Sequence, residues 1–240
     1  MTHEQPPSRV LLKVSGEALM GDAGFGIDGA TVDRIARDIK EGFDLDVTIG
    51  VVVGGGNIFR GVRVAAKGGD RVTGDHMGML ATVINALSLR NALQKIGVPT
   101  VVMSAIAMPE IAESFSQRKA LTHLAHGRVV IFAGGTGNPF FTTDTAAALR
   151  AAEMGAGLLL KATQVDGIYS ADPKLDPTAT RFDRITHDEV LTRGLTVMDT
   201  AAVAVAREND IPVAVFSIHE PGSFGAVLRG EGRATYVADA

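Results

Sequence analysis

A short apolar run that ends in three consecutive glycines constrains the fold of this chain more than any other feature. Residues 47–53 read VTIGVVV and pass directly into Gly54-Gly55-Gly56. Glycine reaches positive φ and lacks a Cβ, so an anion can approach the bare backbone N–H groups. Arg60 follows and offers a planar fork of donors that matches phosphate oxygens. The segment therefore predicts a buried strand that ends at an anion-binding turn.

Two more apolar runs end in the same way. Residues 129–133 pass into a second glycine loop at residues 134–137, and residues 10–14 pass into Ser15-Gly16 and carry Lys13. The carboxyl ends of parallel strands lie at one edge of a sheet, where ligands of open α/β sheets bind. Lys13 alone could be a surface lysine, and the triple glycine alone could be a packing turn. Together the three junctions indicate a phosphate site.

Apolar runs alternate with segments of helical periodicity, which favours βαβ units and a sheet covered on both faces. We expect strands at residues 10–14, 48–53, 100–103, 129–133, 157–161 and 213–216. Helical spacing appears at Val32, Ile35, Ala36, Ile39 and Phe43, and again at Met77, Leu80, Ala81, Ile84 and Leu87. Further helices should begin near Thr143 and after Asp199, a suitable N-cap. We therefore predict an α/β fold, a three-layer αβα sandwich around a central, mostly parallel sheet, as one domain over residues 9–240 after a disordered tail at 1–8.

Composition excludes several classes of function. The chain has no cysteine, so it has no disulfide, zinc–thiolate site or thiol nucleophile. Its net charge is −4 without a block of like charges, which argues against nucleic acid as a partner. No apolar segment approaches the roughly 18 residues of a membrane helix, and no signal pattern precedes residue 8. We expect a cytoplasmic protein whose phosphorylated ligand is small.

The segment from Thr136 to Asp144 is rich in groups that bind nucleotides. Its hydroxyls and amides can bond a sugar phosphate or a base edge. Thr142 or Thr143 should cap a helix whose N-terminal amides attract anions. We expect at least one of Phe140 and Phe141 to lie in the core. The chain has neither the Gly-x4-Gly-Lys-Ser/Thr nor the Gly-x-Gly-x-x-Gly motif, so the loops must bind phosphate by another geometry.

Two carboxylates lie among these anion-binding groups. Asp144 is either a first-turn acid favourable to the helix dipole or the group that holds catalytic lysines in place. Lys161, at the end of its own strand, is its expected partner and a second catalytic cation, because phosphoryl transfer needs positioning and charge stabilisation. Asp75 is either an N-cap or an acceptor for a ribose diol. The turn-rich residues 163–184 should form a lid or binding loop.

These residues, in this order, resemble the bacterial UMP kinases, members of the amino acid kinase superfamily. The matching stretches begin at Lys13, Gly54, Gly74, Gly135, Lys161 and Ala171, and the likeness extends from Val10 to Val237. The resemblance implies an amino acid kinase-like fold with the acceptor in the N-terminal half and ATP against residues 160–240. It implies transfer of the γ-phosphoryl group of ATP to UMP, giving UDP and ADP in de novo pyrimidine nucleotide synthesis. Mg²⁺ would be carried by ATP rather than by a protein metal site.

The resemblance also implies roles for individual residues. The catalytic set would be Lys13, Arg60, Asp144 and Lys161. ATP would be bound by Lys13, Val14, Ser15, Gly16, Gly56, Arg60, Thr163, Tyr169 and Asp172. UMP would be bound by Gly55, Asp75, Thr136, Gly137, Asn138, Pro139, Phe140, Phe141, Thr142 and Thr143.

Regulation and assembly follow from the same resemblance. Similar enzymes are homohexamers, and they are often activated by GTP and inhibited by UTP. The effector-responsive loop would comprise Gly21, Asp22, Ala23, Gly24, Phe25 and Gly26, with Arg90 and Arg128 as weaker candidates for effector contacts at a subunit interface.

Two alternatives stay open: an amino-acid or carbamate kinase, and a non-catalytic protein of this fold that binds nucleotides or oxyanions. Asp75 and the threonine-rich loop favour a ribonucleotide. Lys13, Asp144 and Lys161 favour an enzyme.

Overall fold

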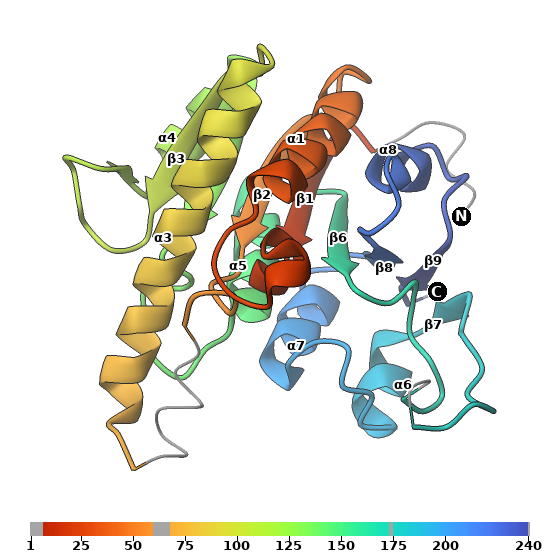
Figure 1. Ribbon diagram of the computed structural model, residues 1–240. Helices are drawn as coiled ribbons and strands as arrows, with labels where there is room; N and C mark the ends of the chain where they lie inside the picture. The colour runs from red at the N-terminus through yellow and green to blue at the C-terminus, as the bar shows by residue number, and fades with distance from the viewer. Residues whose placement is uncertain (1–6, 60–67, 173–174, 240) are drawn as a thin grey trace.

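The computed structural model describes residues 7–59, 68–172 and 175–239. Most of the predicted tail, and Arg60 with it, lies outside these ranges. Within them, nine strands form one sheet in the order β4-β3-β5-β2-β1-β6-β8-β9-β7 (Figure 1). The strands are β1 (Arg9–Val14), β2 (Thr48–Val53), β3 (Thr100–Ser104), β4 (Glu113–Ser114), β5 (Val129–Ala133), β6 (Leu158–Thr163), β7 (Arg184–Ile185), β8 (Val213–Ser217) and β9 (Ala234–Val237).

Each neighbouring pair in this sheet is parallel except β8 and β9, which are antiparallel. The predicted central, mostly parallel sheet is therefore confirmed, and all six expected strands are present. The sequence did not predict β4, β7 or β9. Two of these have only two residues, too few for any periodic pattern.

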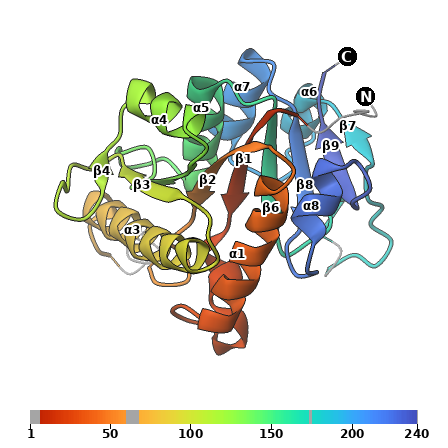
Figure 2. The same cartoon turned by 90° about the horizontal axis from the view of Figure 1, so that it is seen from above.

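Helices cover both faces of the sheet, which confirms the three-layer arrangement (Figure 2). On one face lie α1 (Gly29–Phe43), α3 (Arg71–Lys95) and α8 (Ser223–Leu228). On the other lie α4 (Gln117–Ala125), α5 (Thr143–Met154), α6 (His187–Thr192) and α7 (Thr200–Glu208). Two short 3₁₀ helices follow β1, η1 (Gly16–Leu19) and η2 (Gly21–Ala23). No helix in the described ranges is long and apolar enough to span a bilayer.

The alternation of side chains along β1 decides which face each residue meets. Leu12 and Val14 belong to the core beneath α1 and α3, whereas Leu11 belongs to the core beneath α5 and α7. Successive strand residues point to opposite faces. Lys13 therefore shares the face of Leu11, and its ammonium group is directed to the side of the sheet that α5 covers.

Helix α3 departs from the sequence prediction in two ways. It begins at Arg71, because the Asp70 carboxylate caps it by accepting from Thr73 N at 2.8 Å, so Asp75 lies inside the helix and is not its N-cap. The helix is confirmed, but Met77, Leu80 and Ile84 of its apolar stripe are 43%, 49% and 50% exposed. Ala81 of the same stripe is buried, and Leu87 packs against the core. The helix is apolar on more than one side, so the sheet packs against another set of residues and leaves Met77, Leu80 and Ile84 exposed. That set includes Val83, Ala86, Leu89 and Leu93.

The sequence predicted a long irregular segment at residues 163–184, and residues 164–172 and 175–183 lie outside the named helices and strands. An isolated antiparallel bridge joins Tyr169 to Arg181, and Phe182 N donates to Ile168 O at 2.8 Å. The segment therefore folds back on itself as a hairpin-like excursion beside the carboxyl edge of β6.

Candidate active site

The three strand-to-glycine turns meet in space. They follow β5, β2 and β1, which are neighbours in the sheet. Gly54 N donates to Val14 O at 2.9 Å, and a Cβ on Gly16 would lie only 2.7 Å from Gly56 N. A Cβ on Gly54 would lie 2.7 Å from Gly16 N. The turns after β1 and β2 thus touch backbone to backbone, and only glycine fits at Gly16 and Gly54.

The two predicted catalytic lysines lie side by side. Lys13 and Lys161 are register partners on the adjacent parallel strands β1 and β6. Asp144, in the first turn of α5, lies between them. Lys161 Nζ donates to Asp144 Oδ2 at 2.6 Å, and Lys13 Nζ forms an ion pair with Asp144 Oδ1 at 2.8 Å. We call these three residues the lysine cluster; the predicted contact between Asp144 and Lys161 is confirmed.

The lysine cluster holds an excess of positive charge in a largely buried place. The side chains of Lys13, Asp144 and Lys161 are 9%, 14% and 11% exposed. Burial alone would raise the pKa of Asp144, but the two ammonium groups outweigh it and hold that pKa below its ordinary value of 3.8. Burial and the neighbouring Lys13 lower the pKa of Lys161 below 10.5, against the pull of Asp144. Two cations with one anion leave a charge that an incoming phosphate would neutralise.

The helix that carries Asp144 is fixed by hydroxyl groups and a second carboxylate. Thr142 caps α5, as predicted, by accepting from Asp144 N at 3.0 Å. Thr142 Oγ1 also donates to Asp199, and Thr145 Oγ1 donates to Asp199 Oδ1 at 2.8 Å. Asp199 itself caps α7 through Ala202 N. The sequence predicted Asp199 only as a cap, because nothing local shows that it also anchors α5.

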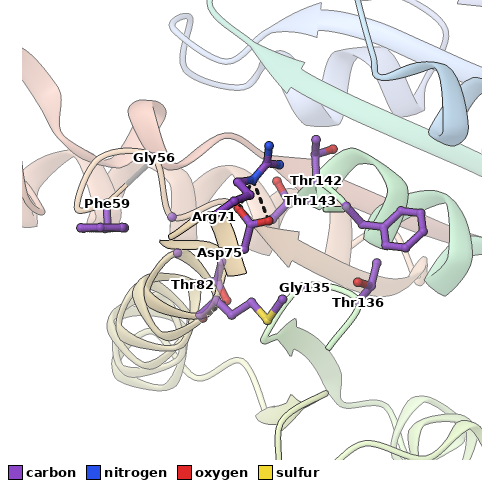
Figure 3. Close-up of a pocket in the computed structure, with 13 residues that line it drawn as sticks. Gly56, Phe59, Arg71, Asp75, Thr82, Gly135, Thr136, Thr142 and Thr143 are labelled. Carbon is purple, nitrogen blue, oxygen red and sulfur yellow. Dashed lines mark hydrogen bonds and ion pairs between the residues drawn. The ribbon is translucent and has the colours of Figure 1, made fainter. Parts of the chain in front are cut away.

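A cavity of about 440 Å³ opens between the glycine turns and α3. Figure 3 shows Arg71 and Asp75 joined within this cavity. Of the residues assigned to UMP by resemblance, Gly55, Asp75, Thr136, Phe141, Thr142 and Thr143 line it, as does Gly56. Arg71, Phe59 and Thr82 line it too and were not predicted. We call it the acceptor cavity.

The Asp75 carboxylate in the acceptor cavity accepts hydrogen bonds from two residues of the protein. Arg71 Nε donates to its two carboxylate oxygens at 2.9 and 2.8 Å, and Phe140 N donates to Oδ2 at 2.7 Å. Phe140 adopts φ 72°, a left-handed conformation costly for a bulky residue, and the Arg71 guanidinium lies 5.6 Å from the centre of its ring. Phe140 and Phe141 are 66% and 51% exposed, so the expectation that one is a core residue is wrong.

Of the remaining residues of this loop, Asn138 is exposed, and Gly137 and Pro139 are half-buried. Gly137 has φ 79°, and Thr136 Oγ1 donates to Asn138 O at 3.0 Å. Asn138 N in turn donates to Thr136 Oγ1 at 3.1 Å. Of the loop residues assigned to UMP by resemblance, Gly137, Asn138, Pro139 and Phe140 do not line the acceptor cavity in this structure.

A second cavity, of about 490 Å³, opens on the other side of Thr142. It is lined by Asp144 and Lys161 of the lysine cluster and by the loop that leads into α7. Apolar side chains, among them Leu191, Val197 and Met198, form one of its walls. We call it the donor-side cavity. Two members of the lysine cluster, Asp144 and Lys161, therefore line this cavity. The acceptor cavity reaches the cluster only through Thr142 and Thr143, which directly precede Asp144 in the chain. Each cavity is large enough to hold much of a nucleotide.

Three residues assigned to ATP by resemblance lie away from the donor-side cavity. Thr163 ends β6, and Asp172 lies exposed on the irregular segment. Tyr169 lines a separate cavity of about 470 Å³ bounded by α8. Tyr169 Oη donates to Asp166 Oδ1 at 2.6 Å, which raises the pKa of the Tyr169 hydroxyl. In this structure the lysine cluster and these three residues are not gathered around one cavity.

The residues predicted to respond to effectors occupy three places. Residues 21–26 lie in η2 and the turn after it, where Phe25 is 69% exposed. Gly26 N donates to Asn57 O at 2.9 Å, so this loop contacts the turn after β2. Arg90 lies on α3. Arg128 immediately precedes β5, and its Nη1 forms a hydrogen bond of 3.0 Å with Nδ1 of His123.

Comparison with known proteins identifies the family and the fold. Residues 8–217 match the amino acid kinase family, and the chain belongs to that family. A uridylate kinase of Agrobacterium fabrum is 75% identical over 231 residues, 96% of each chain, and one of Brucella abortus is 71% identical over 239 residues, the full length of both. The solved UMP kinase of Bacillus anthracis superposes with a TM-score of 0.94 at 38% identity and covers 98% of this chain and 97% of its own.

Proposed function

We infer that this protein transfers the terminal phosphoryl group of ATP to UMP and releases UDP and ADP. The observation that carries this conclusion is the lysine cluster, which holds two ammonium groups about one carboxylate. Asp144 and Lys161 of the cluster line the donor-side cavity, and Thr142 and Thr143, which precede Asp144, line the acceptor cavity. Full-length relatives named uridylate kinase support UMP as the acceptor. The comparisons do not favour an amino-acid kinase or a non-catalytic binding protein.

The arrangement suggests how the reaction proceeds. UMP would occupy the acceptor cavity with its phosphate against the glycine turns. The ATP phosphates would meet the lysine cluster, and the rest of ATP would extend toward Tyr169 and the cavity that it lines. Lys13 and Lys161 would then face the phosphoryl group from the same side of the sheet, where their charge offsets the charge on its oxygens. Asp144 would hold both ammonium groups in place. Arg60 would add a further cation, and its position lies outside the described residues.

Magnesium would reach the site with the nucleotide. Among the described residues, no three His, Cys, Asp or Glu side chains are grouped to hold a metal ion. Asp144 and Asp199 both line the donor-side cavity, which fits the one or two carboxylates that accompany phosphate-bound Mg²⁺. The bound ion would neutralise charge on the β- and γ-phosphate oxygens.

We further propose the assignments that the resemblance implied for ATP, UMP and the effectors. GTP would activate through residues 21–26 with Arg90 and Arg128, and UTP would inhibit. We propose a homohexamer, as the resemblance implies. The exposed apolar side chains of α3 (Met77, Leu80 and Ile84) support an interface with a second copy but do not determine the number of subunits. We propose a cytoplasmic location, in keeping with the water-soluble nucleotides that the reaction uses.

The function is tested with purified protein, ATP, Mg²⁺ and a panel of nucleoside monophosphates. UMP should be converted to UDP with stoichiometric formation of ADP, and AMP and GMP should react far more slowly. Phosphorylation of CMP or of an acidic amino acid without turnover of UMP would overturn the substrate assignment. Binding of ATP with no turnover of any acceptor would favour the non-catalytic alternative.

A further inference from the structure

A buried pair of asparagine side chains joins three elements around the acceptor cavity. Asn57 follows the glycine turn of β2, and Asn85 lies in the middle of α3; they are 3% and 0% exposed. Asn85 Nδ2 donates to Asn57 Oδ1 at 2.7 Å, and Asn57 Nδ2 donates to Asn85 Oδ1 at 3.1 Å. Two side-chain amides that are so deeply buried satisfy one another.

The remaining donors of the pair determine what it connects. Asn85 Nδ2 also donates to Gly54 O at 2.6 Å, and Asn57 Nδ2 also donates to Gly26 O at 2.7 Å. Rotating either amide by 180° would place oxygen against a carbonyl oxygen, so the network has one consistent orientation. The pair therefore ties the glycine turn after β2 to α3 on one side and to residues 21–26 on the other.

Packing shows that the glycine turn depends on α3 for its position. A Cβ on Gly55 would lie 2.7 Å from Gly78 O and 2.9 Å from Ala81 Cβ, so the turn lies directly on the helix. One helical turn from Gly78, Thr82 Oγ1 accepts from Gly134 N at 2.8 Å. Both glycine loops of the acceptor cavity are thus held by α3, one through Asn85 and the other through Thr82.

We propose that Asn57 and Asn85 are positioning residues for phosphoryl transfer. They hold the Gly54–Gly56 turn in register with Lys13 and couple it to residues 21–26, so displacement at either end moves the amides that receive the acceptor phosphate. Neither side chain needs to touch a nucleotide. The proposal rests on the proposed function, because the phosphate that the turn positions is that of the acceptor.

The test compares Asn85→Ala with Leu89→Ala, which lies one turn further along α3, is fully buried and has no polar link to the loops. Both should lower the thermal midpoint. Assayed well below that midpoint, Asn85→Ala should lower kcat/KM for UMP by about 10- to 100-fold, because misplaced binding groups cost this much. Leu89→Ala should stay within about twofold of the unaltered protein. Asn57→Ala should reproduce the loss, and the double variant should lose little more.

Hydrogen exchange gives a readout that a purely structural role would not produce. In Asn85→Ala, amide exchange should increase at residues 54–57. It should also increase at residues 21–26, which lie outside α3 and are linked to it through Asn57. In Leu89→Ala, it should increase along α3 only. Equal kinetic losses in both variants, or unchanged exchange at residues 21–26, would overturn the proposal. If the unaltered protein failed to phosphorylate UMP, the proposed function would fail, whereas the exchange result would still report on the coupling.

Discussion

The lysine cluster and the acceptor cavity lie next to each other but differ in how their charged groups are arranged. In the cluster, three largely buried ionised groups leave an excess positive charge, and each is fixed by the sheet or by a helix cap. In the acceptor cavity, the Asp75 carboxylate is already paired with Arg71, and glycine amides and threonine hydroxyls provide further polar groups. The difference suggests that the cluster acts on charge that develops in the transition state, whereas the cavity binds and orients the acceptor.

The largest expected effect is the loss of a cluster cation. Lys13→Ala should lower kcat on the order of 10²- to 10³-fold and change KM for UMP little, because the lysine acts mainly on transition-state charge. Lys40→Ala provides a control, since Lys40 pairs with Asp44 on the exposed surface of α1. Steady-state kinetics with both substrates measures the effect. A KM increase equal to the kcat loss would contradict the division between cluster and cavity.

A substitution in the acceptor cavity should show the opposite pattern. Asp75→Ala should raise KM for UMP about tenfold, because a charged hydrogen-bond acceptor for the ribose is lost. Its effect on kcat should be much smaller. Repeating the assay with 2′-deoxy-UMP sharpens the comparison, because the variant should discriminate less between the two sugars. A variant whose KM matches that of the unaltered enzyme would remove Asp75 from substrate binding.

The pH dependence should belong to the cluster alone. The folded pKa of Lys161 lies below 10.5, so kcat should fall as pH rises through that lowered value, where the ammonium group loses its proton. Over the same window Lys161 binds more protons in the unfolded chain than in the folded one, so this group makes stability rise with pH and does not itself promote unfolding there. Lys161→Arg should shift the basic limb of the kcat profile upward, and Asp75→Ala should leave it unchanged. If the basic limb of the kcat profile were the same in Lys161→Arg as in the unaltered protein, the limb would report the titration of another group.

The smallest expected effect concerns backbone strain in the cavity wall. Phe140 has φ 72°, which asparagine tolerates better, so Phe140→Asn should raise the free energy of unfolding by up to about 1 kcal/mol. Phe141→Asn is the matched control, because Phe141 is similarly exposed and has no positive φ. Denaturant unfolding measures both. Destabilisation by Phe140→Asn would show that its ring contributes more through Arg71 than its backbone costs.

The lysine cluster was largely predictable from sequence. Each member follows a local signal: Lys13 and Lys161 end apolar strands, and Asp144 follows a threonine that can cap a helix. Parallel strands bring their carboxyl ends to one edge, so these local signals also predicted that the residues meet. The six central strands were predictable for the same reason, because each is a short apolar run between turns.

The acceptor cavity was less predictable because its contacts join segments distant in sequence. Arg71 pairs with Asp75 within one helix, but the hydrogen bond from Phe140 N to the Asp75 carboxylate comes from a loop 65 residues away. The exposure of Met77 and Ile84 depends on which side of α3 meets the sheet, and periodicity alone cannot choose between two apolar sides. Asn57 and Asn85 lie 28 residues apart, and no sequence motif predicts that they pair.

A crystal structure with UMP and a non-hydrolysable ATP analogue would show whether the glycine turns and the lysines meet the two substrates. We expect the acceptor phosphate against the Gly54–Gly56 turn and the γ-phosphate oxygens about 2.7–2.9 Å from the ammonium groups of Lys13 and Lys161. Nucleotide phosphates bound elsewhere, with Lys13 still paired only to Asp144 and directed away from them, would contradict this expectation.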